Sequence, residues 1–580
     1  MTFRAKPVVK SPRRSSRDGQ SRRNLYLNIG FGITVFLAVV ILVSVVAIKW
    51  YSDHLAAAAS VDGQTITRDD FTERGKIEIW LLQQQVARIN DAVAAGRLTS
   101  AESQQRMQAI QQAGQSQQLT PAIIERLIDT RIQAKLAAEA GITATPEQIE
   151  AKIVADSTTA EERHAWIIAV RPVPDTGKTE PTEAQKAAAK AIADKALADI
   201  TTGGKTWEDV AKAVSTDSTK TSGGDLGWID KDSAEDKVLL DALFAAEANK
   251  PTAVLVAEDG TYEIGRVTEI APAVVDTAWK QKLQDAGISL AAYNKVIEAD
   301  VIHQALVDKA IADASNADKQ RHVLEISLAE PQTPPSDKAV KVRHILYAPN
   351  DDPTKAKDLD PADPAWAAAK AEADAAYAEL QKDPSKFDAM ARADSDEESA
   401  QGDTGSGGKL PYVDTDGQFV QEFADAVLKD GLKAGDILPP VKTDFGYHVI
   451  QILYRPPDLD EINSLKTQIA GGADFATIAR NYSDGAEGGK GGDRGWVAPG
   501  LLDDRLIQAI FAAPIGGLTD VVDVKGDGLF FYKVVEERTQ KPDAEQLATI
   551  KAQAFQNWYA GKKSALTITR QLLDELAPSQ

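Results

Sequence analysis

Three stretches of the chain repeat one order of hydrophobic and polar positions. Each begins with an apolar, β-branched run typical of a buried strand, followed by an Ala-rich pattern with helical spacing. A short helix pattern, a Ser-Asp or Ser-Thr-Asp turn, a Gly-Gly loop, a second amphipathic helix and a closing strand complete the order. Such a mixture predicts a multidomain α+β protein. We call the stretches repeat 1 (residues 157–273), repeat 2 (340–456) and repeat 3 (457–540 with 321–335).

Repeat 3 has no strand pattern immediately before its helices. The run "RHVLEISLAE" at residues 321–330 lies just before repeat 2 and has no other place in the pattern. If repeat 2 is inserted into repeat 3, this run supplies the missing strand, and domain termini often lie close enough together for such an insertion. A repeat 3 without its first strand fits the sequence equally well.

The segments around the repeats show helical spacing. Residues 55–156 and 274–320 flank repeat 1, and residues 541–580 form the C-terminal end, where one more helix is expected. Within the first flank a helix is expected to start at Pro121, because proline suits the first helical position.

Residues 25–48 are uncharged and almost wholly apolar. This length is enough to cross the hydrocarbon core of a membrane, which needs ~20 residues. Eight of residues 1–24 are Lys or Arg, so the positive-inside rule places this basic tail in the cytoplasm and the rest of the chain outside. The alternative is a cleaved signal peptide, but its apolar core usually runs ~7–15 residues. We therefore expect a single transmembrane helix in a bacterial cell membrane.

The composition excludes several classes of site. The 580 residues carry a formal net charge of −21 even with the basic tail included, so the body of the chain repels nucleic acid. With no Cys, the chain has no disulfide, no thiolate metal site and no Cys nucleophile. We expect no metal, no cofactor and no nucleic-acid partner.

Histidine is rare, and half of it occurs in one local setting. Three of the six His follow an Arg at the start of a strand pattern, namely His164, His322 and His344. A fourth, His448, lies in the closing strand of repeat 2, in "GYHVI". A lone His on a strand is usually a core residue, and we expect that role for His164 and His322.

Together these features resemble parvulin-type peptidyl-prolyl cis/trans isomerase domains. The resemblance is carried by "VRHILYAP" (342–349), by "GYHVI" (446–450) with the Gly-Gly loop between them, and by the same order in the other repeats. The segment "VDGQTITRDDF" (61–71) and the helical flanks resemble the chaperone domain of the SurA/PrsA/PpiD foldases. The resemblance implies a helical chaperone domain split by repeat 1, and three units with a small antiparallel or mixed sheet surrounded by helices.

For repeat 2 the resemblance implies a complete isomerase site. His344 and His448 match the two His that parvulin domains place on adjacent central strands, and Glu397 stands where the family usually has Cys or Asp. Thr443 completes the implied catalytic set. The substrate-binding residues implied by motif position are Leu410, Phe419, Phe423 and Tyr447.

Repeat 1 is expected to be degenerate. It keeps His164 and Asp217, but Glu263 stands where the second His should be. Leu239 takes the place of a pocket Phe. We expect a weak or inactive unit that binds peptide or acts as a spacer.

Repeat 3 is expected to be degenerate as well. If it owns His322, it has Phe530 at the position of the second His and Gly485 at the acidic position. The same binding or spacing role is expected for it.

The expected function is that of a membrane-anchored, extracytoplasmic foldase. Rotating an X-Pro bond breaks amide resonance against a barrier of ~18–20 kcal/mol but cleaves no bond, so no nucleophile or cofactor is required. The expected partners are unfolded or nascent exported polypeptides with X-Pro bonds. Two alternatives are a holdase without useful isomerase activity and a secretion-accessory protein whose repeats dock one fixed partner.

Overall fold

The computed structural model describes residues 54–176, 178, 180–330, 335–402, 405–455 and 458–576. They form two compact units, one of residues 54–302 with 567–576 and the other of residues 303–566. No helix in these described ranges is long and apolar enough to cross a membrane. The predicted basic tail (1–24) and transmembrane helix (25–48) lie outside the described residues.

A helical body makes up much of the first unit. Its helices are α2 (Arg68–Ala94), α3 (Ser100–Ala113), α4 (Ser116–Glu139), α5 (Pro146–Ser157), α9 (Trp279–Asp285) and the first part of α10 (Leu290–Ser315). Segments far apart in the sequence share its core, because Trp80 meets Trp279 edge-on with ring centroids 4.6 Å apart. The Trp279 indole N–H donates to the Tyr293 hydroxyl at 3.2 Å. The body is therefore one folded core, although the chain leaves it between α5 and α9.

A small sheet belongs to the same body. It has the order β16-β1-β2, from β1 (Ala57–Val61), β2 (Gln64–Thr67) and β16 (Ile568–Thr569). The turn between β1 and β2 has positive φ at Asp62 (48°) and Gly63 (75°), as a two-residue hairpin of the primed type requires.

Repeat 1 is inserted into the helical body through a two-stranded neck. There β3 (Thr158–Thr159) pairs with β8 (Val274–Val275). Beyond the neck lies an antiparallel sheet with the order β5-β4-β7-β6, which packs against three helices. The elements are β4 (Glu162–Val170), α6 (Glu183–Thr201), α7 (Trp207–Val214), β5 (Asp225–Ile229), α8 (Lys237–Ala245), β6 (Leu255–Val256) and β7 (Tyr262–Ala271).

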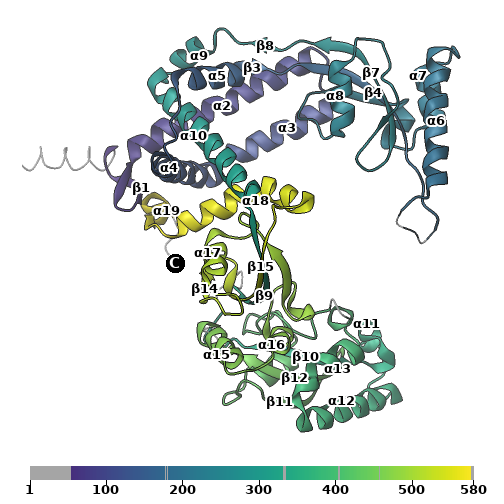
Figure 1. The fold of residues 1–580 in the computed structure, drawn as a ribbon, viewed down its shortest axis with the longest axis vertical. Coiled ribbons are helices and arrows are strands. Elements are labelled where there is room, and N and C mark those ends of the chain that lie inside the picture. The colour runs from purple at the N-terminus through teal and green to yellow at the C-terminus, as the bar shows by residue number, and fades with distance from the viewer. Residues whose placement is uncertain are drawn as a thin grey trace, which may run out of the picture. The chain divides into compact units, whose positions relative to one another are not determined.

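Repeat 3 is built from two separate segments of the chain. β9 (Lys319–Ala329) pairs along its length with β15 (Gly528–Thr539), and the two strands lie side by side in Figure 1. The sheet has the order β13-β9-β15-β14, so β9 is a central strand. The other elements are α15 (Asp458–Ala470), α16 (Phe475–Tyr482), β13 (Asp493–Val497), α17 (Asp504–Ala512) and β14 (Val522–Val524). The first strand of repeat 3 thus precedes repeat 2 in the chain, which is the nested arrangement.

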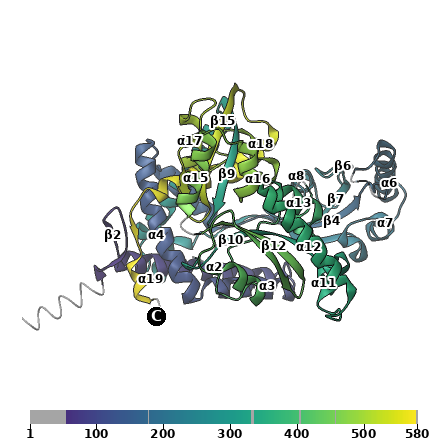
Figure 2. The ribbon, with the colours of Figure 1, turned by 90° about the horizontal axis from the view of Figure 1, so that it is seen from below.

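Repeat 2 forms its own antiparallel sheet between the two segments of repeat 3. The order is β10-β12-β11, from β10 (Lys341–Tyr347), β12 (Gly446–Tyr454) and β11 (Ile437–Thr443). One face packs on α12 (Pro364–Lys382) and α13 (Phe387–Asp394), seen beside the strands in Figure 2. The other face packs on α14 (Gln421–Val427). Repeats 1 and 3 have a fourth strand beside the first one. In its place repeat 2 has isolated bridges, which join β10 and the residue just before it to the segment that follows the Gly-Gly loop.

Two expectations about helices need correction. α4 begins at Ser116, so Pro121 lies inside the helix instead of at its start. An interior proline costs roughly 3 kcal/mol, but Ile124 and Ile128 of the same helix are fully buried, and their burial offsets this cost. The single helix expected at 541–580 is two helices, α18 (Ala544–Ser564) and α19 (Gln571–Leu576).

Candidate active site

The Gly-Gly loop of repeat 2 holds the backbone of its first strand. Gly408 has a φ of 78°, and its carbonyl accepts the backbone N–H of His344 at 2.8 Å. A Cβ at this position would lie 1.9 Å from the His344 carbonyl oxygen, so a residue with a side chain does not fit. The loop thereby fixes the strand segment that carries His344.

Antiparallel pairing brings two His to one face of this sheet. His344 on β10 lies opposite Ile450, and His448 on β12 lies opposite Leu346, so the two His are diagonal neighbours. Their Nδ1 atoms are 2.9 Å apart, and their rings stack with centroids 5.1 Å apart. Each residue is only 5 % exposed. The two imidazoles therefore form one buried pair.

A chain of hydrogen bonds runs through the His pair. Glu397 Oε2 contacts His344 Nε2 at 2.5 Å, and Thr443 Oγ1 contacts His448 Nε2 at 2.8 Å. With both rings neutral, one proton arrangement satisfies every nitrogen. Thr443 O–H donates to His448 Nε2, His448 Nδ1–H donates to His344 Nδ1, and His344 Nε2–H donates to Glu397. Ser399 donates to the other Glu397 oxygen at 2.9 Å, so the network is satisfied from within.

Burial and hydrogen bonding set the charges in this network. Burial, together with the neighbouring His344, lowers the pKa of His448 to about 3, so this ring is neutral at physiological pH. The hydrogen bond from His344 lowers the pKa of Glu397 below its usual value despite partial burial, so the carboxylate is ionised and accepts. These charges agree with the proton arrangement above.

Apolar side chains form the wall next to the His pair. Phe423 of α14 is 2 % exposed and meets both imidazoles edge-on, with centroids 5.7 Å from His344 and 5.2 Å from His448. Phe419 stacks on Phe423 with centroids 5.8 Å apart, and Leu410 packs against the same core. The site thus combines an apolar surface with a buried polar network that holds its own protons.

The structure brings together all but one of the residues predicted for the site. Those brought together are His344, His448, Glu397, Thr443, Leu410, Phe419 and Phe423. Tyr447 is the exception, and its assignment to the substrate pocket is corrected. Its ring lies 6.1 Å from that of Trp366 in the core on the other face of the sheet. Adjacent residues on a strand point to opposite faces, so Tyr447 and His448 cannot line one pocket.

The Arg-His pairs of the three repeats do not occupy equivalent positions. The residue whose N–H donates to the carbonyl of the second loop Gly is His344 in repeat 2, Ile167 in repeat 1 and Glu325 in repeat 3. His164 and His322 lie three residues earlier on their strands. Repeats 1 and 3 therefore lack the first His as well as the second, which corrects the expectation that they keep it.

In repeat 1 a carboxyl group occupies the position of the second His. Glu263 lies opposite Ala169 on the paired strand, as His448 does opposite Leu346. Burial, with repulsion from nearby carboxylates, raises the pKa of Glu263 to about 7. An acid stands here without an imidazole partner, because Ile167 fills the position of the first His.

In repeat 3 a different network fills the same place. Glu325 accepts from the Tyr532 hydroxyl at 3.0 Å and pairs with Arg494 at 3.3 Å. A Cβ at Gly485 would lie 2.7 Å from Glu325 Oε1, so an acidic residue here would displace the Glu325 side chain. Phe530 stands at the position of the second His. The scaffold is kept, and the site is filled by side chains that satisfy one another.

Sequence reasoning missed the polar contacts that join repeat 2 to repeat 3. Lys341 pairs with Asp484 of repeat 3 at 3.1 Å, and Arg343 donates to the Asn481 side chain at 2.9 Å. Lys409 donates to backbone carbonyls at the end of α16. The sequence did contain a signal for these contacts. It places three cations on a buried strand and a tight loop, and buried charges need partners.

Family models match all three repeats. One described as a PPIC-type PPIase domain, a peptidyl-prolyl cis/trans isomerase, matches residues 344–453. A second model with the same description matches residues 149–270 and 459–538. The chain carries parvulin-type PPIase domains. The two segments matched by the second model are the parvulin-type domains that lack the His pair.

Curated relatives are chaperones of the SurA kind. The chain is 28 % identical over 151 residues to Chaperone SurA of Methylococcus capsulatus, which covers 21 % of this chain and 32 % of the relative. It is 28 % identical over 243 residues to Chaperone SurA of Methylobacillus flagellatus, covering 36 % of this chain and 53 % of the relative. The chain thus spans about a third to a half of the length of these curated relatives.

Solved structures of related proteins also match parts of the chain. One is from the two SurA-like chaperones PEB4 and Cj1289 of Campylobacter jejuni. It is 18 % identical and covers 44 % of this chain and 98 % of that one, with a TM-score of 0.19. A PpiC-type isomerase domain is 21 % identical and covers 20 % of this chain and 95 % of that one, with a TM-score of 0.17.

Proposed function

We propose that the chain is a foldase for exported polypeptides, in which repeat 2 isomerises X-Pro bonds and the helical body binds unfolded segments. The observation that carries the proposal is the His344–His448 pair beside Phe423. Within the described residues, repeats 1 and 3 have other side chains at both His positions. The isomerase-domain match over residues 344–453 and the SurA relatives support the same class of function.

The geometry suits rotation of an amide and not bond cleavage. Turning an X-Pro bond passes through a twisted amide that has lost its resonance, at a cost of ~18–20 kcal/mol. The twisted amide is less polar than the planar one, so an apolar surface that excludes water stabilises it relative to the ground state. Leu410 and Phe419, which are partly exposed, supply such a surface, and the buried Phe423 packs against Phe419. The His pair beside them is held rigidly by its own hydrogen bonds and gives up no proton.

A cavity in the helical body supports the chaperone half of the proposal. It has a volume of about 370 Å³ and is lined by residues of α2, α4 and α10 and by Ile66 of β2. Ile66, Leu127 and Val296 contribute apolar surface, and charged residues of the same helices stand around them. A cavity of this size fits side chains of an extended client segment.

The location outside the cytoplasm is part of the same proposal. It is supported by the uncharged apolar segment 25–48 after a basic tail. Protease added to the outside of spheroplasts tests it. The residues after about 52 should be degraded, whereas an epitope tag at the N-terminus should be protected.

Isomerase activity of the full-length chain is the central test. We expect it to accelerate cis/trans exchange of a short Ala-Pro peptide, measured by NMR exchange spectroscopy. His344→Ala should lower kcat/KM about 100-fold, because it removes the centre of the preorganised network. His322→Ala is the matched control in repeat 3 and should leave the rate unchanged.

A folded parent chain that fails to accelerate exchange contradicts the enzymatic half of the proposal. If the same sample then suppresses the aggregation of an unfolded protein, the result favours a holdase without isomerase activity. Equal losses in His344→Ala and His322→Ala would place the activity outside repeat 2.

A further inference from the structure

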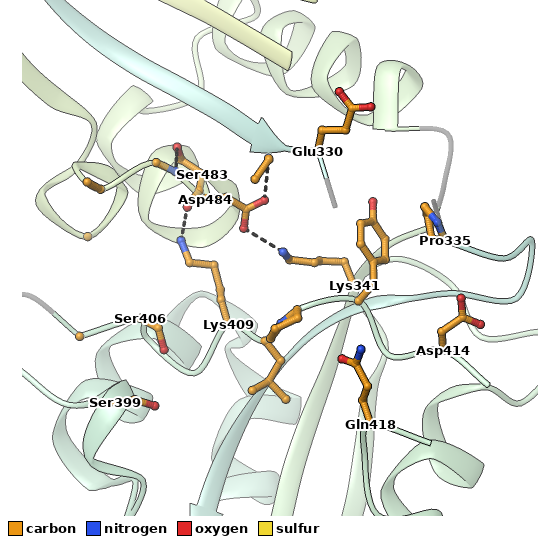
Figure 3. A pocket seen from close by; sticks show the side chains of 18 of the residues that line it. Glu330, Pro335, Lys341, Ser399, Ser406, Lys409, Asp414, Gln418, Ser483 and Asp484 are labelled. Atoms are coloured by element: carbon orange, nitrogen blue, oxygen red, sulfur yellow. Dashed lines mark hydrogen bonds and ion pairs between the residues drawn. The ribbon is translucent and has the colours of Figure 1, made fainter. Parts of the chain in front are cut away.

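A large cavity lies where repeat 2 meets repeat 3. Its volume is about 1190 Å³, and its walls come from the Gly-Gly loop region of repeat 2 and from the turn after α16 of repeat 3. Figure 3 shows Lys341 and Lys409 pointing toward Asp484 and Ser483, with the carboxylates of Glu330 and Asp414 apart from them. Both repeats contribute to one wall, so the cavity exists only when the two are docked.

In the other repeats, the polar side chains on the corresponding strand edge find their bonding partners within the same repeat. In repeat 3, His322 bonds Asp493 at 2.7 Å and stacks on Trp496 with centroids 5.5 Å apart. Counted from the Gly-Gly loop, the same trio recurs in repeat 1 as His164, Asp225 and Trp228. In both repeats a His and an Asp of one repeat satisfy each other.

Repeat 2 has two lysines where the other repeats have this His and Asp. Lys341 takes the place of the His, Lys409 that of the Asp, and Tyr412 that of the Trp. Lys341 lies 5.5 Å from the Tyr412 ring and pairs with Asp484 of repeat 3 at 3.1 Å. Lys409 donates to the carbonyls of Arg480 and Ser483, at the C-terminal end of α16 where the helix dipole favours a cation. Repeat 3 therefore supplies the acceptors that this edge lacks.

The charge left in the cavity is negative even though Lys409, whose partners are neutral carbonyls, still counts as one cation. Lys490 is also committed, to Glu487 at 3.0 Å. Glu330, Asp414 and Asp416 line the cavity and form no ion pair in the part of the chain that the structure describes, although the charge of Lys525 interacts with Glu330 at longer range. Their recorded bonds come from neutral groups: the N–H of Gly526, the N–H and hydroxyl of Ser336, and the N–H of Gln418, among others.

The cavity shares two of its lining residues with the surroundings of the candidate active site. Leu410 lines the cavity and also packs in the core cluster that contains Phe423. Ser399 lines the cavity and donates to Glu397, the carboxylate bonded to His344. A client whose proline lies against the partly exposed Leu410 and Phe419 would therefore place its neighbouring residues at the cavity.

We propose that this cavity binds the client residues flanking the proline, and that its unpaired carboxylates favour Lys or Arg among them. The inference rests on the proposed function, because it assigns a subsite to the same proline pocket. It gives repeat 3, which lacks the His pair, a direct part in the choice of substrate. A basic flank also suits a body of strong net negative charge, with −21 over the whole chain.

The test uses the full-length chain and three peptides that share one Ala-Pro bond. The peptides carry Lys, Ala or Glu at the second and third residues on either side of that bond. Affinity is measured by fluorescence anisotropy of labelled peptides, and turnover by NMR exchange. We expect the Lys peptide to bind about fivefold more tightly than the Ala peptide, and the Glu peptide about fivefold more weakly.

Two charge-matched variants locate the effect. Glu330→Gln, Asp414→Asn and Asp416→Asn combined should bring the three peptides to within about twofold of one another. Asp358→Asn, Asp360→Asn and Glu372→Gln remove three exposed carboxylates of repeat 2 that do not line the cavity, and should keep the order Lys, Ala, Glu.

The readouts separate this inference from the proposed function. Equal affinities of the parent for the three peptides overturn the inference, as does an unchanged preference in the cavity variant. Absence of exchange with every peptide would instead contradict the isomerase proposal, while the order of affinities still decides whether the cavity selects basic segments.

Discussion

Repeats 2 and 3 share a backbone and differ in what it carries. In both, a Ser hydroxyl accepts a strand N–H, from Leu346 to Ser395 and from Ser327 to Ser483, each at 3.1 Å. In both, the second loop Gly has a φ near 80° and lies against the carbonyl of the first strand. The shared features are backbone contacts, which tolerate many sequences provided that a few small residues are kept.

The side chains at the site follow a different rule. Repeat 2 has a buried His pair next to an apolar wall, whereas repeat 3 has Glu325 bound by Tyr532 and Arg494. The second arrangement occupies the space and satisfies its own charges, so one substitution would not restore a site. The comparison shows that a parvulin-type scaffold persists independently of its active site.

The largest effect is expected where the repeats are alike. Gly408→Ala places a methyl group 1.9 Å from the His344 carbonyl, so β10 must move. We expect repeat 2 to lose about 4 kcal/mol or more of its free energy of unfolding, measured by hydrogen exchange in β10 and β12. Gly417→Ala is the control, because Gly417 has the same φ of 78° but no atom within 4 Å. Only the backbone cost of about 1–2 kcal/mol should appear there, and equal losses in the two variants would contradict the argument.

An intermediate effect is expected in the pH dependence of stability, which should differ between repeat 2 and repeat 3. The folded pKa of His448 is about 3, below the ~6.5 of an unfolded His. Between these values the unfolded state binds more protons, so the free energy of unfolding of repeat 2 should fall as the pH is lowered from 6.5. The loss should reach about 2–3 kcal/mol at pH 4.5, and the lowered pKa of Glu397 adds to it at lower pH.

Hydrogen exchange of β12 peptides at pH 6.5, 5.5 and 4.5, corrected for the intrinsic exchange rates, measures this loss. Peptides of β15 from the same sample serve as the reference, since Phe530 at the equivalent position does not titrate. His448→Gln should flatten the dependence. A parent repeat 2 that is equally stable at all three pH values would show that His448 is not held neutral by burial.

The smallest effect is expected from a change in the aromatic wall. Replacing Phe423 by Leu gives repeat 2 the residue type that repeat 1 has at this position. Phe423→Leu should change the stability of repeat 2 by less than about 1.5 kcal/mol, because volume is largely kept. It should lower kcat/KM for an Ala-Pro peptide about tenfold, since the edge contacts with both His rings are lost. Phe511→Leu makes the same change on α17 of repeat 3 and should have no effect on turnover. An unchanged rate in Phe423→Leu would mean that bulk alone suffices at this position.

Much of the site could be predicted from the sequence because its motifs are local. His344 and His448 each lie in a short strand pattern, and pairing of those strands is enough to bring them together. The prediction for Tyr447 is wrong because motif position does not fix which face of the sheet a side chain lies on. The alternation of side chains along the strand does, and it can be read from the sequence.

The register of the first strands was harder to predict. An Arg-His dipeptide opens all three strands, but the next Pro in the sequence comes five positions after the His in repeat 2, eight in repeat 1 and nine in repeat 3. This difference was the available signal. No local sequence pattern predicted the contact between repeats 2 and 3. The residues that form it come together only in the nested topology, and they include Lys341, Lys409 and Asp484.

Because repeat 3 is split in the sequence, its two central strands are synthesised at different times. Glu325 on β9 and its partner Tyr532 on β15 are separated by 207 residues. A ribosome adding about 5–20 residues per second would make β9 wait about 10–40 s for β15. Repeat 2 is fully synthesised well before that interval ends, so we expect it to fold before repeat 3, the domain that encloses it in the sequence.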